Sequence, residues 1–212
     1  NFDDSGEQIQ ILAANGSVIK EFTYNDKAPW PAAADGDGWS LVLIKPQTNP
    51  DHNAAHNWRP SAAVNGNPGG SDVANYATWK STHSITSDHG DDDQDGVSNI
   101  TEFLMKSDPG SASSRPAISG GIQTILVDPG PGLPPVAGDY LTLTFDRDPA
   151  ADEVDYFPEI STDNTDWSGS LTDLVRVSVT PNPGGTQTEI WRSTVPATGD
   201  RRRYGRVRIS AP

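Results

Sequence analysis

Proline and glycine interrupt this sequence at short intervals and limit the length of any helix that it can form. The chain of 212 residues contains 18 Pro and 20 Gly, and both residues are unfavourable in the interior of a helix. Between these interruptions, apolar and polar residues alternate over short runs, for example at residues 140–145 and 175–179. A period of two is typical of strands with one buried face. The pattern therefore excludes a helical bundle and predicts a mostly β fold.

Two clusters of turn-forming residues divide the chain into three regions. The clusters lie at residues 67–70 and 108–110, and their Asn, Asp, Pro and Gly residues are typical of turns. We therefore expect a partial β-sandwich at residues 1–70, a helical linker at residues 71–113 and an antiparallel β-sandwich at residues 114–212.

Alternating runs predict strands in the first and third regions. In the first region, Asn15-Gly16 separates two of these runs, and this dipeptide is typical of a hairpin turn. In the third region, six runs spaced by turns favour an antiparallel sandwich. The expected strands cover residues 8–12, 18–24, 39–44, 122–127, 140–145, 154–161, 174–180, 188–194 and 204–210.

The net charge of −14 excludes some classes of partner. The 29 acidic residues outnumber the 15 Lys and Arg residues, and such a field repels nucleic acid and attracts cations. No apolar run is long enough to cross a bilayer, so we expect neither a nucleic-acid partner nor membrane insertion. The chain also has no Cys, so disulfides cannot stabilise its loops. These properties favour an extracellular or cell-surface protein in which calcium takes the place of disulfides.

One segment has a residue spacing that indicates metal binding. Residues 91–102 read Asp-Asp-Asp-Gln-Asp-Gly-Val-Ser-Asn-Ile-Thr-Glu, and they match the calcium loop of an EF-hand at every fixed position. A hard cation with about seven oxygen ligands at about 2.4 Å needs side chains from alternate positions of one tight turn. We therefore predict a Ca²⁺ site. Its expected ligands are the side chains of Asp91, Asp93 and Asp95, the carbonyl of Val97, Asn99 directly or through water, and both carboxylate oxygens of Glu102.

The alternative interpretation of this acidic run is a solvated loop without an ion. The placement of Gly96 and Glu102 at the positions that the calcium loop requires argues against chance. Residues 99–106 add a second signal, because their apolar side chains recur at the spacing of a short exiting helix. The apolar face of this helix contains Ile100, Phe103 and Leu104.

Several short motifs of the first region are similar to those of a known domain. They lie at residues 5–9, 22–24, 28–31, 37–41, 57–61 and 66–69. The region resembles the second half of a bacterial lamin tail domain, which is an immunoglobulin-like sandwich. With the calcium loop and residues 159–163 and 167, the chain resembles the C-terminal region of large exported bacterial lamin-tail-domain proteins. The resemblance implies two antiparallel, immunoglobulin-like β-sandwich units joined by a short helical EF-hand-like linker.

The first region lacks the part of the lamin tail sandwich that contains its first strands. A half-sandwich exposes an apolar face and an unpaired strand edge, which another strand can complete. We expect this strand to come from the rest of a longer parent chain or from another copy of the protein. Donation between copies that does not close into a ring produces a fibre. The alternative is that the chain is the retained part of a larger polypeptide.

Other residue patterns give weaker evidence for a site. His52 and His56 have the spacing of a metalloprotease helix, but Asn53 stands where the general base Glu is needed. We therefore expect no zinc there. The sequence also contains no nucleophile elbow, no Cys nucleophile and no phosphate-binding glycine loop, so we expect no enzymatic activity.

Tryptophan and arginine each allow two interpretations. The six Trp of the chain could stack against sugars, but three of them match the lamin tail pattern and are expected in the core. Basic residues near the C-terminus are expected on one strand face, where they pair with acids across the sheet or on a neighbouring molecule. The three tryptophans are Trp30, Trp39 and Trp58, and the basic residues are Arg202, Arg206 and Arg208.

Together these patterns predict a non-enzymatic, extracellular structural or adhesive protein that is stabilised by Ca²⁺. We expect it to assemble into a polymer or filament by strand completion between copies. The alternative is a carbohydrate-binding accessory region of a larger secreted enzyme, with a polysaccharide as its partner.

Overall fold

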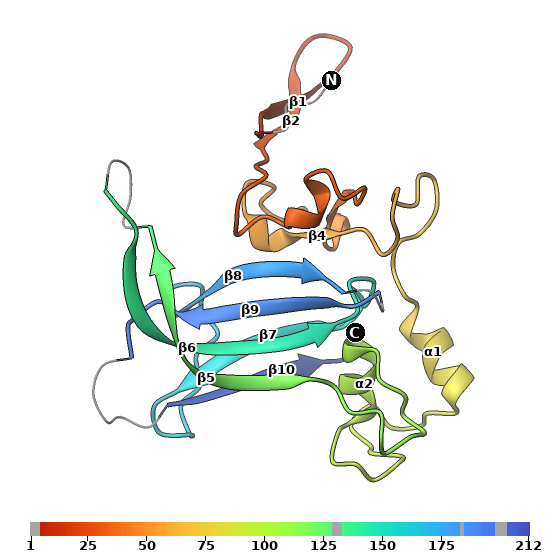
Figure 1. The fold of residues 1–212 in the computed structure, drawn as a ribbon. Helices are drawn as coiled ribbons and strands as arrows, with labels where there is room; N and C mark the ends of the chain where they lie inside the picture. The colour runs from red at the N-terminus through yellow and green to blue at the C-terminus, as the bar shows by residue number, and fades with distance from the viewer. Residues whose placement is uncertain (1–4, 129–132, 183–184, 198–202) are drawn as a thin grey trace.

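The computed structural model describes residues 5–128, 133–182, 185–197 and 203–212 (Figure 1). The regular secondary structure of these residues is mostly strands in several small antiparallel sheets, with two α-helices. The prediction of a mostly β fold is confirmed. Among the helices of these residues, none has the length and apolar character needed to cross a bilayer.

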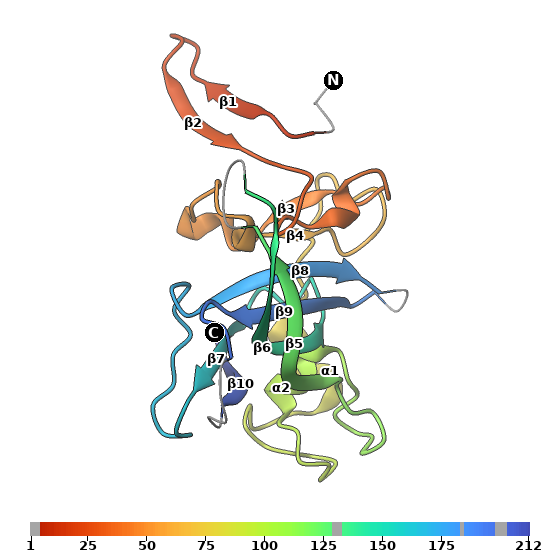
Figure 2. The same cartoon turned by 60° about the vertical axis from the view of Figure 1, so that its left-hand side comes forward.

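The first two strands form a hairpin that projects away from the other sheets (Figures 1 and 2). β1 (Gln8–Leu12) and β2 (Val18–Thr23) pair antiparallel, and Gly16 in their turn has a φ of 82°. Glycine adopts this left-handed conformation without strain, so the predicted hairpin is confirmed. Ile11 and Ile19 remain more than half exposed, which leaves an apolar surface on this hairpin.

A second small sheet follows in the same region. β3 (Leu41–Leu43) pairs antiparallel with β4 (Trp58–Pro60). β3 is shorter than the strand expected at residues 39–44, and β4 was not predicted because three residues are too few to show alternation. Short 3₁₀ turns accompany these strands, and they are η1 (Ala32–Ala34), η2 (Pro46–Thr48) and η3 (Ala55–Asn57).

Aromatic side chains form a small core together with residues of β3 and β4. The rings of Trp30 and Trp58 lie 6.0 Å apart between their centroids, and both residues are buried. Phe22 and Tyr24 pack against them from the hairpin side. The expected core position is thus confirmed for Trp30 and Trp58, whereas Trp39 is only partly buried.

Along the chain, two short helices follow the N-terminal sheets and precede the C-terminal strands. α1 (Tyr76–His83) begins after Asn75, whose side chain accepts a hydrogen bond of 2.8 Å from the Thr78 amide. Such a cap satisfies a backbone donor at the start of a helix. α2 (Asn99–Met105) confirms the predicted exiting helix, which ends one residue earlier than expected.

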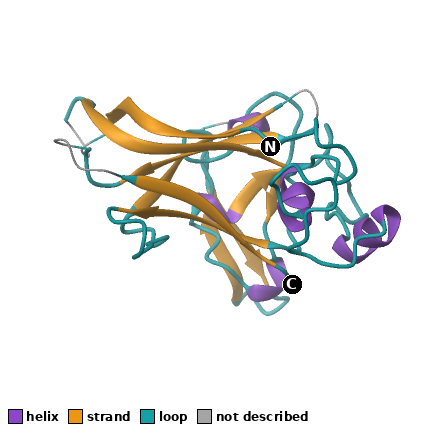
Figure 3. Cartoon of the chain, turned by 90° about the horizontal axis from the view of Figure 1, so that it is seen from below, coloured by secondary structure: helices purple, strands orange, loops and turns teal. Residues whose placement is uncertain are grey.

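The C-terminal strands form a four-stranded and a two-stranded antiparallel sheet. The order of the first sheet is β5-β6-β9-β8, and β10 pairs with β7 in the second. Every strand predicted in this region is present, but β5 and β6 are longer than expected because glycines obscure their alternation. Figure 3, which views the molecule from below, shows the strands in separate layers. The bounds are β5 (Ile118–Val127), β6 (Val136–Arg147), β7 (Asp155–Ser161), β8 (Leu174–Pro181), β9 (Gln187–Ser193) and β10 (Tyr204–Ser210).

The two helices and the C-terminal strands share one apolar core. Ile100 and Leu104 of α2 are at most 1% exposed, and they belong to the same cluster as Leu143 and Phe145 of β6 and Trp191 of β9. The helix that follows the acidic loop is therefore attached directly to the C-terminal sheets.

Buried arginines connect the N-terminal sheet with the C-terminal strands. The guanidinium of Arg59, on β4, donates hydrogen bonds of 2.8 Å to Asp152 and 2.6 Å to Asp72, and its side chain is 0% exposed. Arg176, on β8, donates a hydrogen bond of 2.6 Å to the carbonyl of Ala55. These bonds hold the two parts of the chain together at β4 and β8.

The basic residues of β10 pair across the two-stranded sheet, as predicted. Arg206 and Arg208 donate hydrogen bonds of 2.7 and 2.9 Å to the carboxylate of Glu159 on β7. Arg202 lies outside the residues that the structure describes.

Candidate functional site

The acidic loop brings together the three aspartates that the sequence predicts as ligands. Carboxylate oxygens of Asp91, Asp93 and Asp95 all lie within 4.8 Å of one another. Backbone amides hold them, because the Asp95 amide donates to Asp91 at 3.0 Å and to Asp93 at 3.1 Å. Gly96 has a φ of 89° and donates to Asp91 at 2.8 Å. The loop thus makes the bend that was predicted at this glycine.

Two further predicted ligands lie in the first turn of α2 and are completely buried. Asn99 and Glu102 are both 0% exposed. The side-chain amide of Asn99 donates to the carbonyl of Ser87 at 2.9 Å and to the carboxylate of Asp92 at 3.0 Å. These two bonds orient the side chain and leave its Oδ1 without a hydrogen-bond partner.

Glu102 has an unusual electrostatic environment. One of its carboxylate oxygens accepts a hydrogen bond of 3.3 Å from Ser107, and the other, Oε2, is buried without a partner. Burial, and then the negative charges of Asp93, Asp95 and Asp91, raise the pKa of Glu102 to about 7. The carboxylate therefore lies close enough to the three aspartates to be affected by their charge.

The loop has partners that the sequence did not reveal. Arg115 donates a hydrogen bond of 3.1 Å to Asp95 and offsets part of the negative charge. On the other side, Asp88 accepts hydrogen bonds from Tyr76 at 3.0 Å and Lys80 at 2.9 Å, both on α1. The hydrogen bond from Lys80 lowers the pKa of Asp88. No spacing rule connects these residues, so only the folded chain shows that α1 supports the loop.

The geometry differs in part from the predicted ligand set. The aspartates converge as expected, and the amide of Val97 donates to Asp95 at 2.7 Å. Glu102 does not belong to the group of converging carboxylates, and its bond to Ser107 occupies one of the two oxygens expected to close the site. α1 ends at His83, several residues before the loop. A helix thus leaves the loop directly, but none enters it directly.

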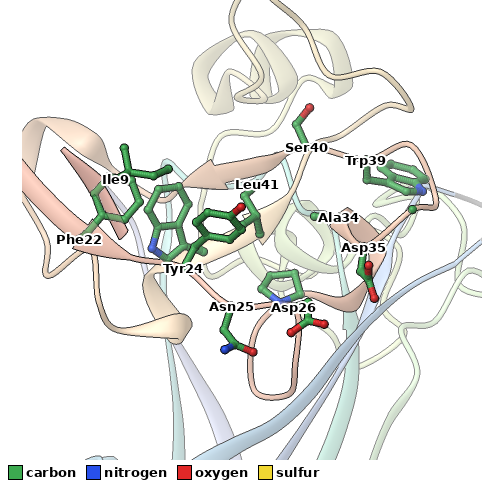
Figure 4. Close-up of a pocket in the computed structure, with 13 residues that line it drawn as sticks. Ile9, Phe22, Tyr24, Asn25, Asp26, Ala34, Asp35, Trp39, Ser40 and Leu41 are labelled. Atoms are coloured by element: carbon green, nitrogen blue, oxygen red, sulfur yellow. The ribbon is translucent and has the colours of Figure 1, made fainter. Parts of the chain in front are cut away.

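A second candidate site is a pocket of about 480 Å³ beside β3. Figure 4 shows Phe22, Tyr24 and Leu41 gathered on one side of it, with Asp26 below them and Trp39 at the opposite end. One buried oxygen of the Asp26 carboxylate has no hydrogen-bond partner. A pocket with apolar walls and a few polar groups is typical of sites that bind small ligands.

Comparison with protein-family models, curated proteins and solved structures finds no match to this chain. The assignment of a function therefore depends on the residues of the loop and the pocket themselves.

Proposed function

We propose that residues 91–102 bind Ca²⁺ and that the ion anchors this loop to the core that α2 shares with the C-terminal sheets. The observation that carries the proposal is a set of buried oxygens without hydrogen-bond partners, namely Asp93 Oδ2, Asn99 Oδ1 and Glu102 Oε2. A buried polar atom without a partner is unfavourable by about 1–3 kcal/mol. A hard divalent cation bound by carboxylate and amide oxygens would supply that partner.

The proposed ion would also stabilise a loop-rich chain that contains no cysteine. The positive charge of Ca²⁺ would offset the repulsion between the three aspartates and Glu102, and the carbonyl of Val97 would complete the set of oxygens. At a free calcium concentration of about 100 times Kd, binding adds about 2.7 kcal/mol to the stability of the folded state. This value is similar to the effect of one disulfide.

Chelation of calcium is expected to lower the melting temperature. A loss of about 2.7 kcal/mol corresponds to a shift of roughly 5–10 °C for a chain of this size. Differential scanning calorimetry with saturating calcium and with a chelator measures this shift. If the two scans superimpose and isothermal titration shows no binding heat, the proposed site does not bind calcium.

Two charge-removing substitutions in the same segment form a matched pair for this experiment. Glu102→Gln removes a proposed ligand charge and should abolish most of the calcium-dependent shift. Asp92→Asn removes an equal charge outside the ligand set, and its side-chain carbonyl still accepts the hydrogen bond that Asn99 donates to Asp92. Asp92→Asn should therefore keep the shift. If both variants lost the calcium-dependent shift of the melting temperature equally, the shift would reflect a general effect of charge and not coordination of the ion.

We further propose that the protein is a non-enzymatic structural or adhesive module at the cell surface or outside the cell. In this proposal it contains two immunoglobulin-like β-sandwich units of the lamin-tail kind, joined by the calcium-binding segment. A four-stranded and a two-stranded sheet that share one apolar core support the C-terminal unit. The projecting β1–β2 hairpin, with exposed Ile11 and Ile19, supports assembly through strand completion by other copies or by the rest of a longer parent chain.

The positions of the buried carboxylates favour a role without catalysis. Among the described residues, Asp152 and Glu189 are buried, and each forms ion pairs with arginine. Such pairing with arginine stabilises the ionised form of a carboxylate, which is consistent with a structural role for both residues. The raised pKa of Glu102 arises beside the proposed calcium ligands, where the ion explains the grouping of carboxylates.

The second candidate function is polysaccharide binding in the aromatic pocket. Trp39 lines the pocket and is partly exposed, so its ring is available to stack on a sugar. A soluble polysaccharide that binds there should quench tryptophan fluorescence, and Trp39→Ala should remove the quenching. Trp167→Phe is the control, because Trp167 lies outside this pocket. Quenching that survives Trp39→Ala would exclude the pocket as the sugar site.

A further inference from the structure

β5 is an edge strand with features that are unusual for an exposed edge. It occupies one end of the four-stranded sheet, and among the strands of the described residues it pairs only with β6. Figure 1 shows β5 and β6 extending together at the left of the molecule, and Figure 2, in which that side comes forward, shows them in the middle of the view. The ten residues of β5 include no charged residue and no proline. Natural proteins usually protect a long edge strand with such residues, so this edge is suited to pairing with another strand.

The exposed apolar residues of β5 lie on one face of the sheet. Ile118, Ile122 and Leu126 are 49%, 53% and 70% exposed, and residues at even spacing point to the same face of a strand. Ile118 lies opposite Phe145 and Ile122 opposite Leu141, both of which are buried. The face of β5 that continues the apolar core is therefore the one that remains exposed.

These three residues are arranged symmetrically within the strand. Ile122 lies four residues after Ile118 and four residues before Leu126. If a second copy of β5 lay antiparallel with the two Ile122 residues opposite each other, each Ile118 would face a Leu126. All six apolar side chains would then lie on one face. A slip by one residue would place the apolar sets on opposite faces. A slip by two residues would keep them on one face but would no longer place each apolar residue opposite another, so the pattern favours this register.

Charge also favours a second copy at this edge. Each chain has a net charge of −14, so contacts between copies are least repulsive where neither surface carries charge. The β1–β2 hairpin offers no such uncharged surface, because β2 itself carries Lys20 and Glu21.

A groove lies beside β5 on the face that carries Ile118 and Ile122. The groove has a volume of about 480 Å³ and lies between β5 and β10. Ile118 and Ile122 line one side of it, and Tyr204 and Gly205 line the other. The side chains of a second β5 would lie next to this groove and extend the apolar surface over it.

We propose that two copies of this protein pair antiparallel through β5, with Ile122 opposite Ile122, and so join their four-stranded sheets into one continuous sheet. This inference rests on the proposed structural function and specifies the surface through which copies associate. The contact uses the same surface on both molecules, so it closes on itself and produces a dimer. Longer assemblies would need the β1–β2 hairpin as a second contact.

Cysteine cross-linking of the full chain tests both the contact and its register. The chain contains no Cys, so each introduced thiol can react only with its counterpart. Directly opposite residues in an antiparallel pair have Cα atoms about 4.5–5.5 Å apart, which is within the range for a disulfide. Ile122→Cys should therefore form a covalent dimer under mild oxidation. Ile118→Cys alone should not, because the two copies of this residue would lie roughly 27 Å apart.

Mixing Ile118→Cys with Leu126→Cys should restore the covalent dimer, because these positions face each other in the proposed register. Sedimentation of the unmodified chain should show a dimer, and Ile122→Lys should weaken it at least about tenfold by placing two like charges opposite each other. Ile19→Lys on the β1–β2 hairpin is the control and should leave the dimer intact.

The outcomes separate this inference from the proposed function. A monomeric unmodified chain, or cross-linking of Ile118→Cys with itself, would overturn the β5 contact. Assembly that resists Ile122→Lys but is lost in Ile19→Lys would also overturn it, although strand completion between copies would then be supported. Calcium binding by a chain that stays monomeric would overturn the dimer alone.

Discussion

Replacing Arg59 with methionine is expected to lower the free energy of unfolding by about 3–5 kcal/mol. The Arg59 guanidinium is completely buried and lies 2.6 Å from Asp72 and 2.8 Å from Asp152, whose side chains are 14% and 5% exposed. Methionine fills a similar volume but leaves both carboxylates without their main cation. Burial already raises the pKa of Asp152 although Arg59 opposes the shift, so removing Arg59 should raise this pKa further.

Urea denaturation of the full chain measures this loss, and Lys45→Met is the matched control. Lys45 pairs with Asp155 between the same two parts of the chain, but their side chains are 30% and 52% exposed. An exposed pair of this kind contributes about 0–1 kcal/mol. If Arg59→Met lowers the free energy of unfolding no more than Lys45→Met does, then the buried pairs do not hold the N-terminal sheet in place.

Replacing Glu189 with glutamine is expected to have an effect of similar size, about 3–5 kcal/mol. Glu189 is 0% exposed, and its carboxylate accepts hydrogen bonds from Arg147 at 2.8 Å, Tyr156 at 3.0 Å, Gln187 at 2.7 Å and Trp191 at 2.9 Å. All four partners are donors, so the amide group of glutamine would place a donor against donors. The substitution would also leave the Arg147 guanidinium buried without its ionised partner.

The same substitution should change how stability depends on pH. Burial raises the pKa of Glu189, but the positive charges of Arg147 and Arg176 outweigh this effect and lower it below its ordinary value of 4.5. The unfolded chain therefore takes up a proton at this residue at higher pH than the folded chain does. The stability that Glu189 contributes is complete above pH 4.5 and falls as the pH decreases through the lowered pKa.

Denaturation between pH 7 and pH 3 tests this expectation. The difference in unfolding free energy between the unmodified chain and Glu189→Gln should shrink as the pH falls below about 4.5. Glu21→Gln is the control, because Glu21 is an exposed residue of the β1–β2 hairpin and should change stability little at any pH. A difference that stays constant with pH would show that the ionised carboxylate is not what stabilises the fold.

Local patterns were sufficient to predict most of the strands. The Asn15-Gly16 turn and the alternation on either side of it predicted the first hairpin, because hairpin geometry depends on a few adjacent residues. The strand β4 was missed because it is only three residues long. Its burial comes from contacts with distant segments, among them the bonds of Arg59 to Asp72 and Asp152.

The candidate calcium loop was likewise predicted only in part from the sequence. The spacing of residues 91–102 predicted the convergence of Asp91, Asp93 and Asp95 because a single turn of backbone places them together. The position of Glu102 depends on the packing of α2 against the C-terminal sheets. Its missing hydrogen-bond partner and its raised pKa therefore appear only in the folded chain.

The sequence by itself determined the β character of the protein, the turn at Gly16 and the bend of the acidic loop at Gly96, because each depends on interactions between close neighbours along the chain. Only the tertiary structure decided which charged residues are buried. Arg59 and Asp152 are 93 residues apart, and Arg147 and Glu189 are 42 residues apart. An isolated arginine in an acidic sequence has no preferred partner until packing removes water from around it, and the low dielectric of the interior then makes one pairing far more favourable than the others.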